Sequence, residues 1–264
     1  MIVPLAGSWA LILGSSSGMG AATAEALARE GVNVLGVHFD TARAAEATDA
    51  LIDKLRAHGG EVHFVNANAA SPSTRADVVA ELRERSGGQG ARVLLHSLAF
   101  GSLVPFIPPP GEAGVSARQL DMTLNVMAHS LVYWTQDLVA ADLLRRGGKI
   151  FAMTSAGDAR VSANYGPVSA AKNALQSHVR QLAVELAPRG IAVNALRAGV
   201  TATPSLLRIP EHEALLARAR AGNPHGRLTT PEDVAAAVVA LSADDSSWLT
   251  GNVIGVDGGE ALTT

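Results

Sequence analysis

Short apolar segments rich in Val, Ile and Leu alternate along the chain with longer segments of helical periodicity. The short segments lack the strict alternation of half-exposed strands, which is typical of strands buried on both faces of a parallel sheet. The longer segments repeat apolar residues every three or four positions, as the crossover helices of βαβ units do. Strands are expected over residues 9–13, 32–37, 62–67, 93–97, 149–154, 191–196 and 252–256, and helices over 21–30, 42–57, 73–85, 116–145, 167–187 and 231–243.

Glycine and proline mark the ends of the expected helices. Glycine stands just after five of them, where a left-handed C-terminal cap is needed. These residues are Gly31, Gly59, Gly87, Gly147 and Gly190. Pro72 and Pro231 follow Ser71 and Thr230, the pattern of an N-cap and a first-turn proline. The boundaries therefore agree with the periodicity.

The alternation predicts an α/β fold, with one doubly wound domain over residues 1–264 around a seven-stranded parallel sheet. No internal repeat, linker or low-complexity stretch divides the chain. Two connections, near residues 101–115 and 198–225, are longer than usual. Since ligands bind beyond the carboxyl ends of the strands in such sheets, both connections are expected to be substrate loops.

The composition excludes several classes of function. Lys and Arg number 21 and Asp and Glu 24, a net charge of −3, whereas a nucleic-acid-binding domain is normally basic. The chain has no cysteine, and its eight histidines lack the spacing of metal ligands, so no metal site is expected. No targeting segment is visible, and the apolar stretch 93–107 is interrupted by His96 and Pro105. A cytoplasmic protein with no nucleic-acid or membrane partner is expected.

A glycine-rich loop follows the first expected strand and leads into the first helix, with the sequence GSSSGMG over residues 14–20. Glycines at Gly14, Gly18 and Gly20 permit a tight turn and the close approach of a pyrophosphate, whose charge is attracted by the free amides at the helix start. The loop therefore predicts dinucleotide binding. The alternative is a simple strand-to-helix turn.

The second expected strand ends at residues that bear on the cofactor's ribose. An acidic residue that binds a ribose 2′-hydroxyl is expected about 20 residues beyond the glycines. The position is occupied by His38, and the nearest carboxylate is Asp40, two residues later. Arg43 could instead bind a 2′-phosphate. Alternatively, Asp40 and Arg43 simply begin a solvated helix.

A tyrosine and a lysine stand seven residues apart, in a chain with only two tyrosines and three lysines. Pro167 belongs in a first helical turn, so Tyr165 is expected at or just before the helix start. Seven residues are close to two helical turns, which places Tyr165 and Lys172 on the same side. A nearby cation lowers the pKa of a phenol from about 10 and makes it a better proton donor near neutrality. The alternative is a half-buried tyrosine and a solvent-facing lysine.

Taken together, the motifs resemble the short-chain dehydrogenase/reductase family over about residues 5–262. The shared features are GSSSGMG, Asn68 after the third strand, Asn125 in the fourth helix, Ser155 after the fifth strand, Lys172, AGVTAT at 198–203 and GNVIGVDGG at 251–259. The resemblance implies a Rossmann fold and a nicotinamide-dependent oxidoreductase. It implies that Tyr165 donates a proton, that Lys172 holds the nicotinamide ribose, that Ser155 contacts substrate or lines the pocket and that Asn125 organises the proton relay.

The motifs and the resemblance together also indicate which residues contact the cofactor. They are Gly14, Ser16, Ser17, Gly18, Met19, Gly20, His38, Phe39, Asp40, Arg43, Asn68, Ala69, Ser97, Leu98, Ala99, Thr154, Tyr165, Lys172, Ala198, Gly199, Val200 and Thr203.

The chain departs from the commonest pattern of this family at its tyrosine. Most members have Tyr-x3-Lys, but the residue four before Lys172 is Val168, and the tyrosine is three positions earlier. Tyr-x6-Lys is the arrangement of the enoyl-acyl-carrier-protein reductases, and the segment HSLAFG at 96–101 is also similar to that subgroup. The chain is most similar to its smaller, serine-containing, NADPH-using type.

The displaced tyrosine suits reduction of a carbon–carbon double bond. In an α,β-unsaturated thioester, the carbon that accepts hydride lies two bonds farther from the oxygen that becomes charged than in a ketone. A shift of three positions along a helix moves a side chain by about 4.5 Å, the right order for this change. The expected reaction is therefore hydride transfer to the β-carbon of an enoyl thioester, with Tyr165 protonating the enolate.

Other functions remain open on the sequence alone. A carbonyl reductase or alcohol dehydrogenase of the same family, such as a 3-oxoacyl-acyl-carrier-protein reductase, is one alternative, and a non-catalytic NAD(P)-binding sensor is another. The cofactor is expected to be NADPH or NADH, and the resemblance favours NADPH. The resemblance also implies an acyl thioester of acyl carrier protein or coenzyme A as substrate and a homotetramer in which two long helices pair across a dimer face.

Overall fold

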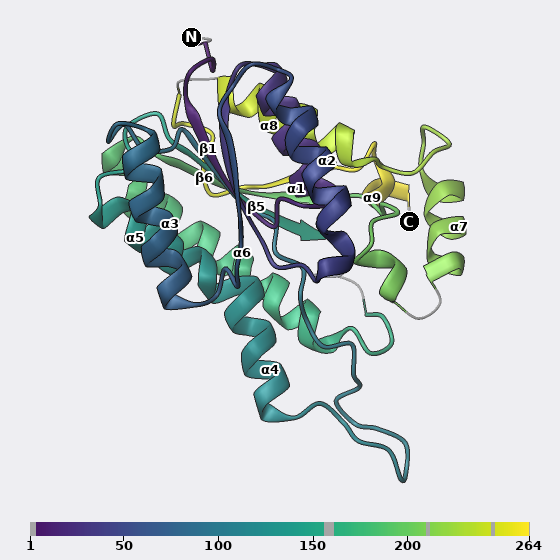
Figure 1. Ribbon diagram of the computed structural model, residues 1–264. Helices are drawn as coiled ribbons and strands as arrows, with labels where there is room; N and C mark the ends of the chain where they lie inside the picture. Colours follow the sequence, from purple (N-terminus) through teal and green to yellow (C-terminus); the bar gives the residue numbers. More distant parts are fainter. Residues whose placement is uncertain (1–3, 156–160, 210–211, 244–245, 264) are drawn as a thin grey trace.

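A seven-stranded parallel sheet forms the centre of the computed structural model, which describes residues 4–155, 161–209, 212–243 and 246–263 (Figure 1). The strand order is β3-β2-β1-β4-β5-β6-β7, so the chain reverses its direction across the sheet between β1 and β4, where such folds bind ligands. The strands are β1 (Trp9–Leu13), β2 (Asn33–His38), β3 (Val62–Asn66), β4 (Val93–His96), β5 (Lys149–Ser155), β6 (Ala192–Ala198) and β7 (Val253–Val256). The predicted fold class is confirmed.

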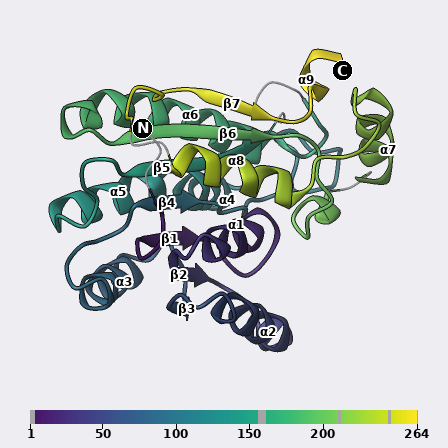
Figure 2. The same ribbon diagram turned by 90° about the horizontal axis from the view of Figure 1, so that it is seen from above.

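Helices cover both faces of the sheet (Figure 2). One layer contains α3 (Pro72–Arg85), α5 (Ser130–Ala140) and α6 (Gly166–Leu186), and the other contains α1 (Gly18–Arg29), α2 (Ala45–Arg56) and α8 (Pro231–Ala243). Three further helices, α4 (Ala117–Leu124), α7 (His212–Gly222) and α9 (Glu260–Thr263), follow connections that leave the carboxyl ends of strands. The segment that leads into α4 projects away from the sheet (Figure 1).

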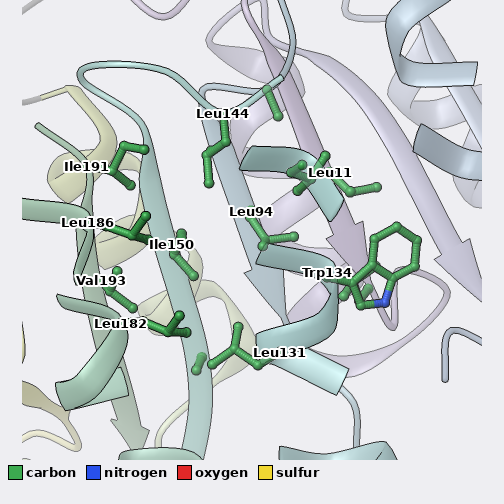
Figure 3. Close-up of a cluster of buried hydrophobic side chains, with 14 of the residues drawn as sticks. Leu11, Leu94, Leu131, Trp134, Leu144, Ile150, Leu182, Leu186, Ile191 and Val193 are labelled. Carbon is green, nitrogen blue, oxygen red and sulfur yellow. The ribbon is translucent and has the colours of Figure 1, made fainter. Parts of the chain in front are cut away.

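Successive residues of each central strand enter opposite cores. Leu11, Leu94 and Ile150 pack toward α3, α5 and α6, and their neighbours Ile12 and Leu95 pack toward α1, α2 and α8. Figure 3 shows the first of these two clusters. Because both faces are buried, both sets of positions must be apolar, which explains the unbroken Val, Ile and Leu runs of the sequence.

The helical expectations need two corrections. The single helix expected over 116–145 is divided into α4, a π-helical turn at Asn125–His129 and α5, and it ends at Ala140. The expected loop over 198–225 contains the helix α7 and the 3-10 turn Leu206–Arg208. Residues 210 and 211 of that loop lie outside the described residues, as do 1–3 and 264 at the ends of the expected domain.

The five glycines expected as helix caps have left-handed backbone, with φ values from +57° to +91°. Gly147 does not cap a helix, however, because α5 ends at Ala140. The described helices include none that is both long and apolar enough to cross a membrane.

Candidate active site

The glycine-rich loop brings β1, β4 and the start of α1 into close contact. Gly14 has φ +86°, and a Cβ there would lie 2.5 Å from the Ser97 carbonyl oxygen. A Cβ at Gly20 would lie 1.9 Å from the Gly14 carbonyl oxygen, so only glycine lets α1 begin so close to the strand. Ser17, the N-cap residue of α1, makes no side-chain capping hydrogen bond. These features fit a dinucleotide, whose pyrophosphate requires a closely approached backbone and free helix amides.

At the end of β2, Asp40 is already engaged by protein groups. Its Oδ2 lies 2.8 Å from His38 Nδ1, and its backbone exchanges two hydrogen bonds with the Asn66 side chain at the end of β3. Phe39, between them, is 72% exposed. Arg43 lies on the exposed surface of the next turn. The predicted ribose-binding residues therefore stand together, with Asp40 fixed and Phe39 and Arg43 accessible.

The other predicted cofactor residues lie at or just beyond the carboxyl ends of β3 to β6. The Ala69 carbonyl accepts a hydrogen bond from Trp134 Nε1 at 2.9 Å, which fixes the turn that holds Asn68. Thr154 is buried, and its hydroxyl accepts a hydrogen bond from Gln176 Nε2 at 3.2 Å. Thr154 therefore lies beneath the surface of the site, with its hydroxyl bonded to α6.

After β6, the chain returns to the start of α1. A Cβ at Gly18 would lie 3.5 Å from the Thr203 methyl group, and a cavity of about 300 Å³ opens between α1 and the segment that contains Thr203 and Pro204. The amide of Val200 donates a hydrogen bond to Glu260 Oε2 at 3.0 Å. The residues predicted at 198–203 thus flank the glycine-rich loop, as cofactor binding requires.

The predicted catalytic side chains meet at the end of β5. Tyr165 is the N-cap residue of α6, as the position of Pro167 predicted, and its Oη lies 3.5 Å from Ser155 Oγ. Lys172 is buried, and its Nζ donates a hydrogen bond of 2.5 Å to the Met153 carbonyl. Ser155 and Met153 are two residues apart on one strand, so the phenol and the ammonium both contact the carboxyl end of β5. Their catalytic roles stay predictions.

Asn125 is the first residue of the π-helical turn, and this turn packs against α6. A π-helical turn inside a helix is rare and is frequently found at functional sites. The structure therefore places Asn125 beside the helix that holds Lys172, and the predicted relay role stays a prediction.

Tyr165 packs against a small apolar cluster. Met127, Val168 and Ala171 are its buried members, and Leu103, Leu124, Val126 and Tyr165 pack against them. The Phe106 ring closes over the start of α6, because a Cβ at Gly166 would lie 2.7 Å from its Cζ. The expected loop at 101–115 therefore reaches the tyrosine and forms an apolar wall beside it.

A comparison with family models decides the classification. A model described as "Enoyl-(Acyl carrier protein) reductase" matches residues 14–260, nearly the whole chain. The chain belongs to the short-chain dehydrogenase/reductase family. It is therefore an oxidoreductase of that family, and the resemblance stated from its motifs is confirmed.

Relatives of this short-chain dehydrogenase/reductase differ in their reactions. A cyclohexanol dehydrogenase from Acinetobacter is 31% identical over 94% of this chain and 93% of its own length. A crystal structure of a Burkholderia cenocepacia short-chain dehydrogenase in complex with NADP has a TM-score of 0.82 and 28% identity, covering 98% of this chain and 99% of that one. A crystal structure of an enoyl-[acyl-carrier-protein] reductase (NADH) from Aquifex aeolicus has a TM-score of 0.84 and 25% identity, covering 98% of both chains.

Two polar residues of this family member were not predicted from its sequence. Glu260 is buried and holds the backbone of Val200, but no sequence motif marks a residue so near the end of the chain. His96, at the end of β4, is fully buried, with Nε2 2.8 Å from Ser130 Oγ. Burial, and then the positive charge of Lys172, lower the pKa of His96 from 6.5 to about 3. His96 is therefore neutral near pH 7.

Within the described ranges, no three His, Cys, Asp or Glu side chains gather as metal ligands would.

Proposed function

We propose that this protein reduces the 2,3 double bond of enoyl thioesters with a nicotinamide cofactor. One observation carries the proposal: the phenol of Tyr165 reaches Ser155 at the end of β5 from the N-cap of α6, seven residues before Lys172. The position four before Lys172 is Val168, which is 5% exposed within the apolar cluster and offers no proton. This position supports a proton donor for an oxygen that lies remote from the reduced carbon.

The side chains around Tyr165 then have distinct tasks. The nicotinamide group, when bound, supplies the hydride for the β-carbon of the substrate. Tyr165 stabilises the enolate oxygen and protonates it, directly or through water, and the resulting enol tautomerises to the saturated thioester. Lys172 holds a positive charge beside the phenol. A donor fixed in place before the reaction stabilises the developing oxyanion without reorganisation, which is usually the largest catalytic contribution.

The surroundings of Tyr165 support a substrate with an apolar tail. Leu103 and Phe106 of the 101–115 loop and Val168 of α6 lie beside the tyrosine and exclude water from the tail. On the other side, the glycine-rich loop would hold the pyrophosphate of the cofactor, with Thr203 near the start of α1. Ser155 is placed to bind the thioester oxygen beside the phenol.

A paired assay tests this function. Crotonyl-CoA and acetoacetyl-CoA are each supplied with NADH and with NADPH, and loss of reduced-nicotinamide absorbance is followed. We expect kcat/KM to be higher for crotonyl-CoA, because the donor is placed for a remote oxygen. Faster reduction of acetoacetyl-CoA would contradict the proposal.

Reduction of a carbonyl group, or oxidation of an alcohol, is the second candidate. It is supported by the 31% identity to a cyclohexanol dehydrogenase and by Ser155 close to the phenol. Faster turnover of acetoacetyl-CoA would favour it. Tight cofactor binding without turnover of a broad panel of enoyl and carbonyl substrates would favour the third candidate, a non-catalytic NAD(P)-binding sensor.

We further propose NADPH as the cofactor, acyl carrier protein or coenzyme A as the acyl carrier, and a homotetramer as the assembly. The exposed Arg43 supports NADPH, although Asp40 lies close by and is bonded to His38. Exposed apolar side chains support assembly: Val184 on α6 and Trp248 before the edge strand β7 are 73% and 93% exposed. Light scattering after gel filtration measures the assembly.

A further inference from the structure

His96 occupies a central place between the sheet and two helices. It ends β4, where it pairs with Leu13 of β1 and Ala152 of β5. Its ring is fully buried on the face that α5 and α6 cover, since Nε2 contacts Ser130 on α5. The next residue along β5 from Ala152 is Met153, whose carbonyl binds the Lys172 ammonium. His96 is thus a buried neighbour of the lysine site.

The hydrogen bonds of Ser130 fix which nitrogen of His96 holds the proton. The Ser130 hydroxyl donates to the Val126 carbonyl at 2.8 Å, within the π-helical turn, and so uses its only proton. Nε2 of His96, 2.8 Å from the same oxygen, must therefore donate to it. Nδ1 is then unprotonated and carries a lone pair.

This Nδ1 atom is buried, and it has no hydrogen-bond partner within the described part of the chain. An unpaired buried acceptor is costly, and in a native structure it calls for an explanation. The explanation available here is electrostatic, because Lys172 binds the carbonyl of Met153, the residue after the one that pairs with His96, and its positive charge contributes to the lowered pKa of His96. The lone pair is the negative end of the ring dipole, and a buried cation nearby is stabilised by such a dipole.

We propose that His96 is a positioning residue for Lys172: Ser130 holds its ring in one tautomer, and the Nδ1 lone pair stabilises the lysine ammonium at the end of β5. The ammonium in turn keeps the Tyr165 phenol acidic enough to donate its proton. The inference rests on the proposed function only in taking Tyr165 as the proton donor. Ser130 bonds His96 to the π-helical turn, and Lys172 bonds to β5 beside the histidine.

The proposal is tested through the Tyr165 phenol. The chain has two tyrosines, so Tyr133→Phe leaves Tyr165 as the only residue whose tyrosinate absorbance titrates. In this background, His96→Asn and His96→Leu have nearly the same shape, but only asparagine offers an acceptor where Nδ1 stands. We expect His96→Leu to raise the Tyr165 pKa by about one unit and to lower kcat about tenfold. His96→Asn should restore much of both.

The readouts separate this inference from the proposed function. Titration of Tyr165 needs no substrate, so it reports on His96 even if enoyl thioesters are not reduced. Equal Tyr165 pKa values in the asparagine and leucine variants would overturn the proposal. If His96→Leu does not fold, Ser130→Ala provides the test, because it keeps the imidazole ring but no longer fixes which of its nitrogens holds the proton. A raised Tyr165 pKa in this variant supports the proposal, and an unchanged Tyr165 pKa overturns it.

Discussion

At the scale of single residues, the site depends on how the chain enters α6. Asn164 has φ +60°, a left-handed conformation that asparagine tolerates better than most residues. The turn delivers Tyr165 to the N-cap position, where its side chain points to Ser155 and is not confined to the helix surface. The phenol is therefore positioned by backbone geometry and by its packing against the apolar cluster, and the side chain does not cap the helix.

Replacement of Tyr165 by phenylalanine tests its catalytic role. The ring keeps its apolar contacts, but its proton is lost, so we expect kcat to fall by about 10²- to 10⁴-fold, while the cofactor dissociation constant rises far less, by the loss of one predicted contact. Fluorescence titration with NADPH measures binding, and single-turnover kinetics measure the chemical step. Tyr133→Phe is the matched control, because Tyr133 lies on α5 beneath the Arg75 guanidinium. Equal rates in both variants would remove Tyr165 from the mechanism.

At the scale of elements, the turn from β1 to α1 is where a strand, a neighbouring strand and a helix start meet. Gly14→Ala and Gly59→Ala form a matched pair, because both residues have strongly positive φ, +86° and +91°. Each alanine costs about 1 kcal/mol in backbone strain. Only Gly14 also faces an obstacle, the Ser97 carbonyl oxygen, whereas the space around Gly59 is open to 4 Å.

We therefore expect Gly14→Ala to unfold at a lower temperature than Gly59→Ala and to lose the stabilisation that added NADPH or NADH gives. Thermal unfolding with and without the dinucleotide measures both effects. A Gly14→Ala variant that the dinucleotide stabilises as much as it stabilises Gly59→Ala would argue against a pyrophosphate at this loop.

The elements that the sequence predicted well are those whose burial is uniform. The strand expected over 149–154 is β5, Lys149–Ser155, because the apolar run coincides with burial on both faces. The π-helical turn could not be predicted, since one extra residue per turn leaves no compositional signature. The helix α7 could have been predicted, because its Ala, Leu and Arg residues favour a helix and Gly222 ends it, but the whole connection was interpreted as a substrate loop.

The site residues divide in the same way, into those that local sequence marks and those that only the fold brings together. Tyr165 was placed correctly because Pro167 fixes the helix start from local sequence. His96 was not identified as a site residue, because its contribution depends on Ser130, 34 positions later, and on the charge of Lys172, which only the folded sheet brings near. Local signals predict local geometry, whereas buried polar contacts between distant elements require the structure.

At the scale of the whole molecule, the sheet order unites the parts of the site. Because β1 and β4 are neighbours while β2 and β5 lie on opposite sides of them, the glycine-rich loop stands between the residues predicted to bind the ribose and the tyrosine site. The same burial that assembles these parts places a titratable ring, His96, in the core. The free energy of unfolding must therefore depend on pH through this residue.

The direction of that dependence follows from the lowered pKa of His96, about 3 in the fold against 6.5 when exposed. Between these values the unfolded chain binds a proton that the folded protein excludes, so His96 costs no stability above pH 6.5 and increasingly destabilises the fold as the pH falls toward 3. The slope is about 1.4 kcal/mol per pH unit. The free energy of unfolding is measured with urea from pH 6 down to pH 4, roughly the middle of this window. It should fall with pH more steeply for the native protein than for His96→Asn, by about 1.4 kcal/mol per pH unit. Parallel slopes would mean that His96 is solvated or already protonated in the fold, and its neutral, proton-donating contact with Ser130 would then have to be abandoned.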